Sequence, residues 1–301
     1  NLSDVEQLWE HTRWMLLRGK MAHLPAIREQ LSGLWQGLLA PFEKDLVRKK
    51  HLVIAPYRGL YQIPFSCLYD QLRQQYLIER WTYSIIPNLT ILSYCQGRPT
   101  LKRAPLLVGY PGEQDSPLFL PGVEVELAHI SKLLPKADVL LGEAASLPEV
   151  EAYFVDRPLI HLAGHIYYNQ TNPLESGMPL AGGGWLRASD LYIKQGSLNG
   201  SVVLLSGCES GSGKLTGSEV LGLNSAFLYA GASGIVSSLW RVDDQATSSL
   251  MTKLYRSISA GKPVAGALQA AQRELLLDPA YEHPFYWAAF SFCGDPSRSA
   301  L

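Results

Sequence analysis

Cysteine is scarce in this chain, and its few positions form neither a disulfide framework nor a metal-binding pattern. The 301 residues include four cysteines, with no CxxC pair and no zinc-site spacing. At this length and density a disulfide framework is not expected, and a reducing cytoplasm is the default compartment. We expect Cys67, Cys95 and Cys293 to be buried as small hydrophobic residues.

Long apolar runs and an excess of charge are also missing. No apolar run approaches the ~20 residues that a membrane-spanning helix needs, so no membrane partner is expected. The formal net charge of −1 gives no basis for binding nucleic acid or an anionic membrane surface. The first residues lack the basic and apolar segments of a signal peptide. Since residue 1 is not methionine, we expect a fragment of a longer chain.

The remaining composition is that of an ordinary globular protein, and the length favours two lobes. Hydrophobic residues make up 47% of the chain and charged residues 18%. Residues 97–105 are the one linker-like stretch, with three positive charges, a glycine and two prolines. We therefore predict an N-terminal lobe of helices and short strands over residues 1–100, and a second lobe over residues 101–301.

Strands and helices alternate from residue 105 to the end, and simpler elements precede them. In the first lobe, helices are expected up to about residue 50, strands at 52–56 and 81–87, and a helix capped by Asn88. In the second lobe, strands are expected at 106–110, 137–141, 158–165, 202–206, 233–240 and 287–293, separated by helices at 123–134, 147–153, 218–229, 243–259 and 263–276. This alternation predicts an α/β fold with a mostly parallel sheet and helices on both faces. Glu124 and Glu126 fall in the first turn of a helix, where its dipole favours acidic residues.

Two of the predicted strands end in a residue that can perform chemistry. One delivers His165 to its carboxyl end, and the apolar run 202–205 leads through Ser206 and Gly207 to Cys208. In an open α/β sheet these ends face the ligand crevice. If the two strands are neighbours, the thiol and the imidazole face each other, as cysteine nucleophile catalysis requires. The alternative is an inert thiol at a strand end.

A metal site is the second interpretation of the histidine strand. His161 and His165 frame the sequence HLAGH, which lacks the glutamate of the helical HExxH zinc motif and follows a strand. No third ligand is evident, so no metal is predicted. We expect His161 to be a buried, hydrogen-bonded residue beneath the site.

A phosphate-binding loop is the second interpretation of the cysteine strand. Residues 207–216 follow a strand and are rich in glycine. The P-loop motif needs four residues between its glycines and a hydroxyl residue directly after the lysine. Here five residues separate Gly207 from Gly213, and Leu215 follows Lys214. Nucleotide binding is therefore the weaker alternative, and no cofactor is predicted.

An acidic pair precedes one of the predicted helices. Asp243 and Asp244 begin the helix expected at 243–259, where an N-cap and a first-turn acid are ordinary. The functional alternative is an acidic wall of a substrate pocket beside the neighbouring strand end. Asp190 is expected to be a helix cap.

A set of motifs in a fixed order resembles the CHAT family, caspase-like peptidases often found behind tetratricopeptide (TPR) repeats. The resemblance covers roughly residues 30 to 295. The motifs are LVIAP (52–56), YQIPF (61–65), YSIIP (83–87), HLAGH (161–165), PLESGMPLA (173–181), LSGCE (205–209), AFLYAGA (226–232), SLWRVDDQAT (238–247) and AAQ (270–272).

The resemblance implies a fold and an activity. The fold is a caspase-like three-layer αβα sandwich preceded by an N-terminal helical and β lobe. The activity is that of a cysteine endopeptidase without metal or cofactor, with His165 and Cys208 as the catalytic dyad. Backbone N–H groups of Ile166 and Cys208 would form the oxyanion hole. Separase-like relatives favour a basic residue before the cleaved bond, which Asp243 or Asp244 would bind. Expected partners are a protein or peptide substrate and TPR repeats or a regulatory protein.

The chain departs from the family pattern at two positions. Ile166 stands where the family has glycine, and Gly207 where it has alanine. Isoleucine disfavours the φ values that glycine permits, so the oxyanion geometry is expected to change. Loss of one oxyanion donor costs about 10²–10³ in rate. The alternative function is therefore a catalytically inactive scaffold for protein–protein interaction.

Overall fold

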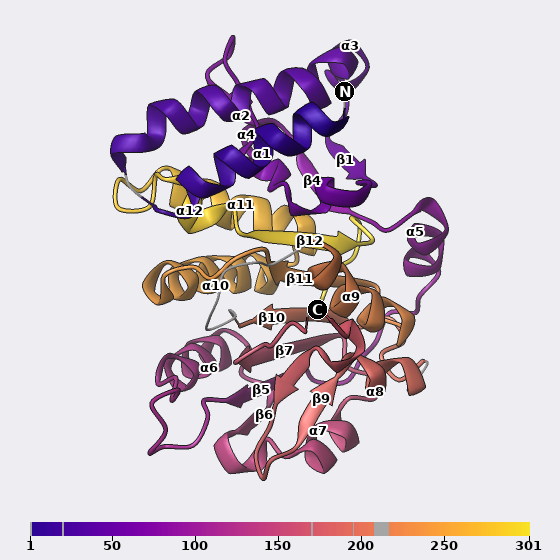
Figure 1. The fold of residues 1–301 in the computed structure, drawn as a ribbon. Coiled ribbons are helices and arrows are strands. Elements are labelled where there is room, and N and C mark those ends of the chain that lie inside the picture. Colours follow the sequence, from indigo (N-terminus) through magenta and orange to yellow (C-terminus); the bar gives the residue numbers. More distant parts are fainter. Residues whose placement is uncertain (1, 20, 170, 195, 208–216) are drawn as a thin grey trace.

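The central feature of the molecule is one sheet that joins both predicted lobes. The computed structural model describes residues 2–19, 21–169, 171–194, 196–207 and 217–301. Within these residues, eight strands form the sheet in the order β1-β4-β12-β11-β10-β7-β5-β6 (Figure 1). Every neighbouring pair is parallel except β11 and β12. The mostly parallel sheet is confirmed.

The elements follow the predicted order closely. The sheet strands are β1 (His51–Ile54), β4 (Thr82–Ile85), β5 (Leu106–Tyr110), β6 (Asp138–Leu141), β7 (Leu159–Gly164), β10 (Val202–Ser206), β11 (Gly234–Ser238) and β12 (Phe290–Gly294). The α-helices are α1 (Leu2–Leu16), α2 (Leu24–Leu38), α3 (Glu43–Leu46), α4 (Leu77–Arg80), α5 (Leu89–Gln96), α6 (Gly122–Leu133), α7 (Leu147–Tyr153), α8 (Ala188–Ile193), α9 (Gly217–Tyr229), α10 (Asp244–Ser259), α11 (Val264–Leu276) and α12 (Pro284–Trp287). Among these residues, no helix combines the length and apolarity needed to cross a bilayer.

The central strands β7 and β10 are buried along their whole length, and their side chains alternate between two cores. Leu159 and Leu204 point into the core under α6, α10 and α11, whereas Ile160 and Val203 point into the core under α7, α8 and α9. An unbroken apolar run is what a strand covered on both faces needs. The helices on both sides are visible in Figure 1. The three-layer αβα sandwich is confirmed.

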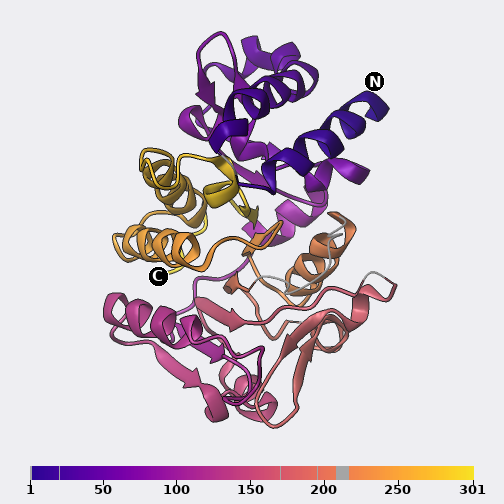
Figure 2. The same cartoon turned by 60° about the vertical axis from the view of Figure 1, so that its left-hand side comes forward.

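The N-terminal region extends this sheet. Strands β1 and β4 continue it beyond β12, where Cys293 is paired with Ile85. One aromatic contact also joins the two predicted lobes, since the rings of Tyr76 and Trp287 meet edge to face at 5.2 Å. Figure 2 shows the N-terminal helices in indigo at the end of the molecule opposite the hairpin of β8 (Gly177–Pro179) and β9 (Trp185–Arg187) in pink. The division near residue 100 stays a proposal, and the sheet runs across it.

The last predicted strand begins later than expected. The stretch from residue 287 was predicted to be extended, but Pro284–Trp287 forms α12, and β12 begins at Phe290 and runs antiparallel to β11. A capped proline explains the error, because the ring Nδ1 of His283 accepts the N–H of Phe285 at 3.1 Å, with Pro284 between them. Two hairpins were not predicted: β2 (Tyr69–Asp70) with β3 (Gln75–Tyr76), and β8 (Gly177–Pro179) with β9 (Trp185–Arg187).

Candidate active site

His165 lies directly beyond the carboxyl end of β7, in the middle of the sheet. Strand β7 ends at Gly164, whose φ of +151° suits glycine and whose α-carbon lies close to the carbonyl of Tyr110. A side chain at this position would meet that carbonyl oxygen at 2.6 Å. The strand therefore ends in a close backbone approach that holds the following histidine at the sheet edge.

The imidazole of His165 is held by a backbone carbonyl that sequence reasoning missed. Its Nε2 lies 2.6 Å from the carbonyl oxygen of Leu118, in the loop before α6. Because a carbonyl can only accept, Nε2 carries the proton in this hydrogen bond. The side chain is 6% exposed, and its ring also lies 5.9 Å from that of Tyr167. No sequence signal marks Leu118, since a backbone group is independent of residue type.

Strand β10, which leads to Cys208, is the neighbour of β7. The pairing is parallel and extends from Val202 opposite Leu159 to Ser206 opposite Ala163. The condition set for the dyad, that the two strands be adjacent, is therefore confirmed. Cys208 itself, and the glycine-rich stretch up to residue 216 considered for phosphate binding, lie outside the described residues.

Ile166 and Gly207, the two departures from the family pattern, are in contact with each other. A Cβ at Gly207 would lie 2.7 Å from Cγ1 of Ile166 and 2.9 Å from its Cδ1, and it would also collide with the carbonyl of Gly164. The isoleucine side chain, 1% exposed, therefore occupies the space that an alanine at position 207 needs. Ile166 is also absent from the residues with positive φ, so its backbone carries no left-handed strain.

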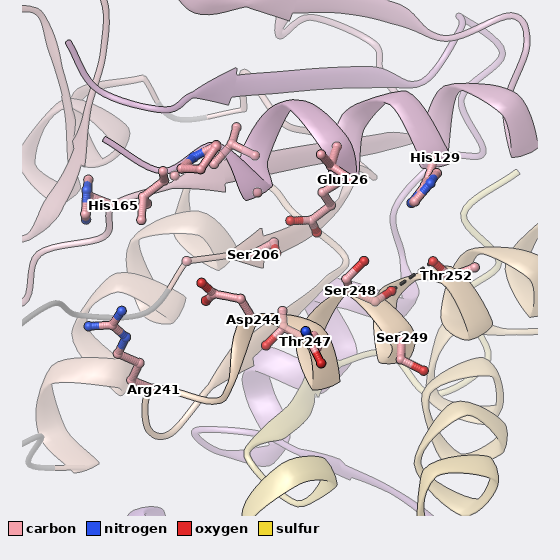
Figure 3. Close-up of a pocket in the computed structure, with 18 of the residues that line it drawn as sticks. Glu126, His129, His165, Ser206, Arg241, Asp244, Thr247, Ser248, Ser249 and Thr252 are labelled. Carbon is pink, nitrogen blue, oxygen red and sulfur yellow. Dashed lines mark hydrogen bonds between the residues drawn. The ribbon is translucent and has the colours of Figure 1, made fainter. Parts of the chain in front are cut away.

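A cavity of about 1100 Å³ opens between α6 and α10 next to His165 (Figure 3). Its walls come from the loop before α6, from α6 and α10, and from the ends of β7 and β10. Gly164, His165, Ser206 and Gly207 line it at the sheet edge. Its charged lining residues are Glu126, Lys132, Arg241, Asp244, Lys253 and Arg256. Both signs are present, so no single charge defines the whole cavity.

The two aspartates expected to bind substrate have different environments. Asp243 is the N-cap of α10, and its Oδ1 accepts the backbone N–H groups of Gln245 at 3.0 Å and Ala246 at 3.1 Å. The N-cap is the structural alternative that the sequence analysis gave for Asp243. Asp244 lines the cavity from the first turn of α10 and is exposed. Asp190 acts at a helix start, where its carboxylate accepts the N–H of Arg187.

His161 is buried, as predicted, and on one face of the sheet it contacts two polar side chains, those of Tyr255 and Glu126. Its Nδ1 lies 2.9 Å from the hydroxyl of Tyr255 on α10, and its Nε2 lies 3.4 Å from Oε1 of Glu126 on α6. Burial, together with the negative charge of Glu126, raises the pKa of Tyr255 well above its ordinary value. Tyr255 therefore remains a phenol. Sequence reasoning missed Glu126, which it assigned to the helix dipole, and Tyr255, which has no motif.

The other three cysteines are buried, as expected. Burial raises the pKa of the Cys95 thiol to about 11 and that of Cys293 to about 12, and it raises the pKa of Cys67 as well. These thiols are protonated near neutral pH and are poor nucleophiles.

The fold is that of caspase-like cysteine proteinases. The chain is similar to separase in the Saccharomyces cerevisiae separase–securin complex, with a TM-score of 0.57 and 13% identity over 82% of this chain and 15% of that one. It is also similar to the Arg-specific cysteine proteinase gingipain R (RgpB) of Porphyromonas gingivalis, with a TM-score of 0.55 and 10% identity over 90% of this chain and 68% of that one. At sequence identities this low, the similarity shows only that the folds are alike.

The chain belongs to the CHAT domain family, whose family model matches residues 28–295. The human tetratricopeptide repeat protein 28 is 24% identical to it over 88% of this chain, and the mouse protein of the same name is 25% identical. The chain spans 13% of the length of either relative. The predicted family is confirmed. Both relatives are named as tetratricopeptide repeat proteins.

Proposed function

We propose that the chain is a cysteine endopeptidase in which His165 and Cys208 form the catalytic dyad. The observation that carries the proposal is the parallel pairing of β7 with β10, which aligns Ala163 with Ser206, two positions before His165 and Cys208. The caspase-like fold, shared with separase and RgpB, supports a hydrolase of this class.

The orientation of His165 supports a particular role for each ring nitrogen. Because Nε2 donates its hydrogen to the carbonyl of Leu118, Nδ1 is the nitrogen that would exchange a proton with the nucleophile. The carbonyl of Leu118 also stabilises the imidazolium that forms when Nδ1 is protonated. The carbonyl of Leu118 thus orients the imidazole, a role that an acidic residue has in a catalytic triad.

In the proposed reaction, the thiolate of Cys208 attacks the scissile carbonyl carbon and the electron pair of the carbonyl moves to its oxygen. Backbone N–H groups of Cys208 and Ile166 would stabilise this oxyanion. The imidazolium of His165 then gives its proton to the leaving amine, and a thioester remains. His165 takes a proton from water, whose oxygen attacks the thioester and releases the acid and Cys208.

The proposed substrate position before the cleaved bond is basic. The Arg specificity of RgpB supports this preference for the fold. Asp244, at the cavity wall, was expected to contribute, and Asp243 was expected to do the same, although its carboxylate caps α10. We further propose that TPR repeats or a regulatory protein act beside the chain, as the names of its relatives suggest, and that it works in the cytoplasm.

The second candidate is a catalytically inactive scaffold for protein–protein interaction. Two observations favour it: the likeness to tetratricopeptide repeat protein 28, and Ile166 in place of the family's glycine. Ile166 has no positive φ, which removes backbone strain as a reason for lost activity.

Cleavage of a fluorogenic peptide set separates the two candidates. The peptides carry Arg, Lys, Asp or Leu before the scissile bond, and wild type is compared with Cys208→Ala and His165→Ala. Turnover that is lost in both variants supports the peptidase. Absence of turnover from wild type, both alone and with the adjoining repeats present, supports the scaffold.

A further inference from the structure

The antiparallel strands that follow His165 have one buried face and one outer face. In β9, Leu186 is buried, whereas Trp185 and Arg187 on either side of it are partly exposed. Tyr167, on the segment that pairs with β8, is likewise partly exposed between two buried neighbours. Because successive side chains of a strand point to opposite faces, Tyr167, Trp185 and Arg187 lie on the outer face.

Gly177 leaves a gap on this outer face across which two aromatic rings meet. It is paired with Tyr167 on one side and with Arg187 on the other, and it has no side chain to separate them. The ring of Trp185, diagonal to Tyr167 across the gap, comes within 5.5 Å of it. The ring of His165 lies 5.9 Å from that of Tyr167. Tyr167 and Trp185 therefore form an aromatic row that starts beside the proposed catalytic histidine.

The aromatic row does not pack the interior of the protein. Among the residues that the structure describes, neither Tyr167 nor Trp185 belongs to the two hydrophobic cores or packs against them. The inward side chains Ile166, Met178 and Leu186 fill the core under α7, α8 and α9 instead. The two rings thus retain partly exposed apolar surface next to His165, where a ligand can cover it.

The charge on the outer face is already neutralised. The guanidinium of Arg187 lies over the ring of Trp185 at 5.5 Å, and its Nε is paired with Oε2 of Glu175 at 3.1 Å. An exposed ion pair of this kind contributes little to the binding of a further charge. The outer face therefore offers ring surface rather than net charge, and it suits an uncharged aromatic side chain better than a carboxylate or a cation.

The aromatic row lies outside the cavity between α6 and α10. Neither Tyr167 nor Trp185 lines that cavity, and Figure 3 shows His165 at one end of the labelled lining residues. In the proposed reaction the imidazolium of His165 gives its proton to the leaving amine, so the segment after the cleaved bond begins next to this ring. A peptide whose preceding residues occupy the cavity therefore continues over Tyr167 and then over Trp185.

We infer that Tyr167 and Trp185 form a subsite for an aromatic side chain of the substrate within the first three residues after the cleaved bond. The inference rests on the proposed function and names a substrate preference that the proposed function leaves open. The ring spacings set the range, because an extended peptide advances ~3.3 Å per residue. Its first two residues pass Tyr167, whose ring is 5.9 Å from that of His165, and the next one reaches Trp185. A substrate ring at 4.5–7 Å from either of them would extend the row.

The test measures binding in the Cys208→Ala background, so that it does not depend on turnover. Fluorescence anisotropy compares labelled peptides that carry Arg before the scissile bond and differ at one of the three positions after it, which holds Phe, cyclohexylalanine or Ala. The variant is Trp185→Leu, which removes the ring and keeps an apolar side chain. The matched control is Trp14→Leu, since Trp14 is exposed on α1 and also has an arginine, Arg18, over its ring.

At one of the three positions we expect Phe to bind about 10-fold more tightly than Ala, and about 3-fold more tightly than cyclohexylalanine, which has similar bulk without the π system. Trp185→Leu should bring the ratio of Phe to cyclohexylalanine toward 1, and Trp14→Leu should leave both ratios unchanged. Equal binding of Phe and Ala at all three positions, no measurable binding of any peptide, or a Phe ratio that survives Trp185→Leu overturns the inference.

A second variant keeps the test open if Trp185→Leu does not fold. Tyr167→Leu leaves β9 intact and should lower the ratio of Phe to Ala by about 3-fold or more. An unchanged ratio overturns the inference. The proposed function is judged separately, by turnover that depends on Cys208. A peptidase without the aromatic preference refutes only the inference, and an aromatic preference without turnover refutes only the peptidase.

Discussion

Two histidines four residues apart, His161 within strand β7 and His165 directly after it, lie in different surroundings. His161, in the strand interior, is 0% exposed and is enclosed by Tyr255 and Glu126. His165, just beyond the strand end, is 6% exposed, lines a cavity and donates a hydrogen bond to the backbone carbonyl of Leu118. Both lie on the α6 and α10 side of the sheet, because residues two apart share a face.

The difference shows how one strand supplies both a support and a reactive group. Within the sheet, neighbouring strands and the overlying helices leave no space for a substrate around His161. At the carboxyl end, β7 stops at Gly164, and His165 borders open volume. Position along the strand, rather than residue type, therefore assigns a structural part to one histidine and a proposed catalytic part to the other.

The largest expected effect separates the two histidines by activity. His165→Ala should lower kcat/KM for a cleaved peptide by about 10²–10⁴-fold, because it removes the proposed proton shuttle. Its stability should fall by about 1–2 kcal/mol, since the hydrogen bond to Leu118 and the ring contact with Tyr167 are lost. Peptide turnover and chemical denaturation measure both, with His11→Ala as control, since His11 is exposed on α1 and does not line the cavity. A variant that retains more than a tenth of the activity contradicts the proposed role.

Restoring the family's glycine at position 166 should cost stability without improving activity. Ile166→Gly removes a buried side chain that packs against Gly207, at an expected cost of about 4 kcal/mol. Turnover should not rise, because the backbone of Ile166 carries no positive φ for glycine to relieve. Urea unfolding and peptide kinetics on the same preparation check this. A gain in turnover of tenfold would place the impairment at Ile166.

Replacing His161 should lower the stability of the fold more than replacing either of its polar neighbours, Tyr255 or Glu126. His161→Ala leaves the hydroxyl of Tyr255 and the carboxylate of Glu126 without their neighbour, and we expect a loss of about 3 kcal/mol. Denaturation midpoints relative to His11→Ala measure this loss. An equal stability for the two variants means that His161 contributes no more than a surface residue.

The smallest effect concerns the hydroxyl that holds His161. Tyr255→Phe retains the buried ring and removes one hydrogen bond, so it should lower stability by about 1 kcal/mol. Combining it with His161→Ala should cost less than the sum of the two, because the partners are coupled. Full additivity in this double-mutant cycle would show that the two side chains do not interact.

The sequence was sufficient for the sheet and for the position of His165, and insufficient for the groups around them. Apolar runs such as 202–205 and capping residues such as Asn88 carry local signals, and Asn88 does accept the N–H of Ile91. The start of β12 was misplaced because Pro284–Trp287 forms a short helix, whose N-cap is the side-chain nitrogen of His283.

The site was predictable only where chemistry and strand ends coincide. The carbonyl of Leu118 has no residue-type signature. Glu126 was predicted to lie in the first turn of its helix, but α6 begins at Gly122 and Glu124 is the acid in that turn, so the helix dipole does not explain Glu126. The Leu118 carbonyl and Glu126 reach their positions through the packing of α6 against β7 and α10, which depends on tertiary structure. The contact between Ile166 and Gly207 links two departures that appear unrelated along the chain.

The most direct test of the proposed dyad needs no substrate. Wild type and His165→Ala are treated with iodoacetamide at neutral pH, and mass spectrometry follows alkylation at each cysteine. Cys67, Cys95 and Cys293 serve as internal controls, because burial raises their pKa values. We predict that Cys208 reacts faster than a free thiol in wild type and slows to the rate of an ordinary thiol in His165→Ala. A Cys208 that reacts at the same rate in both proteins would contradict the pairing of His165 with Cys208.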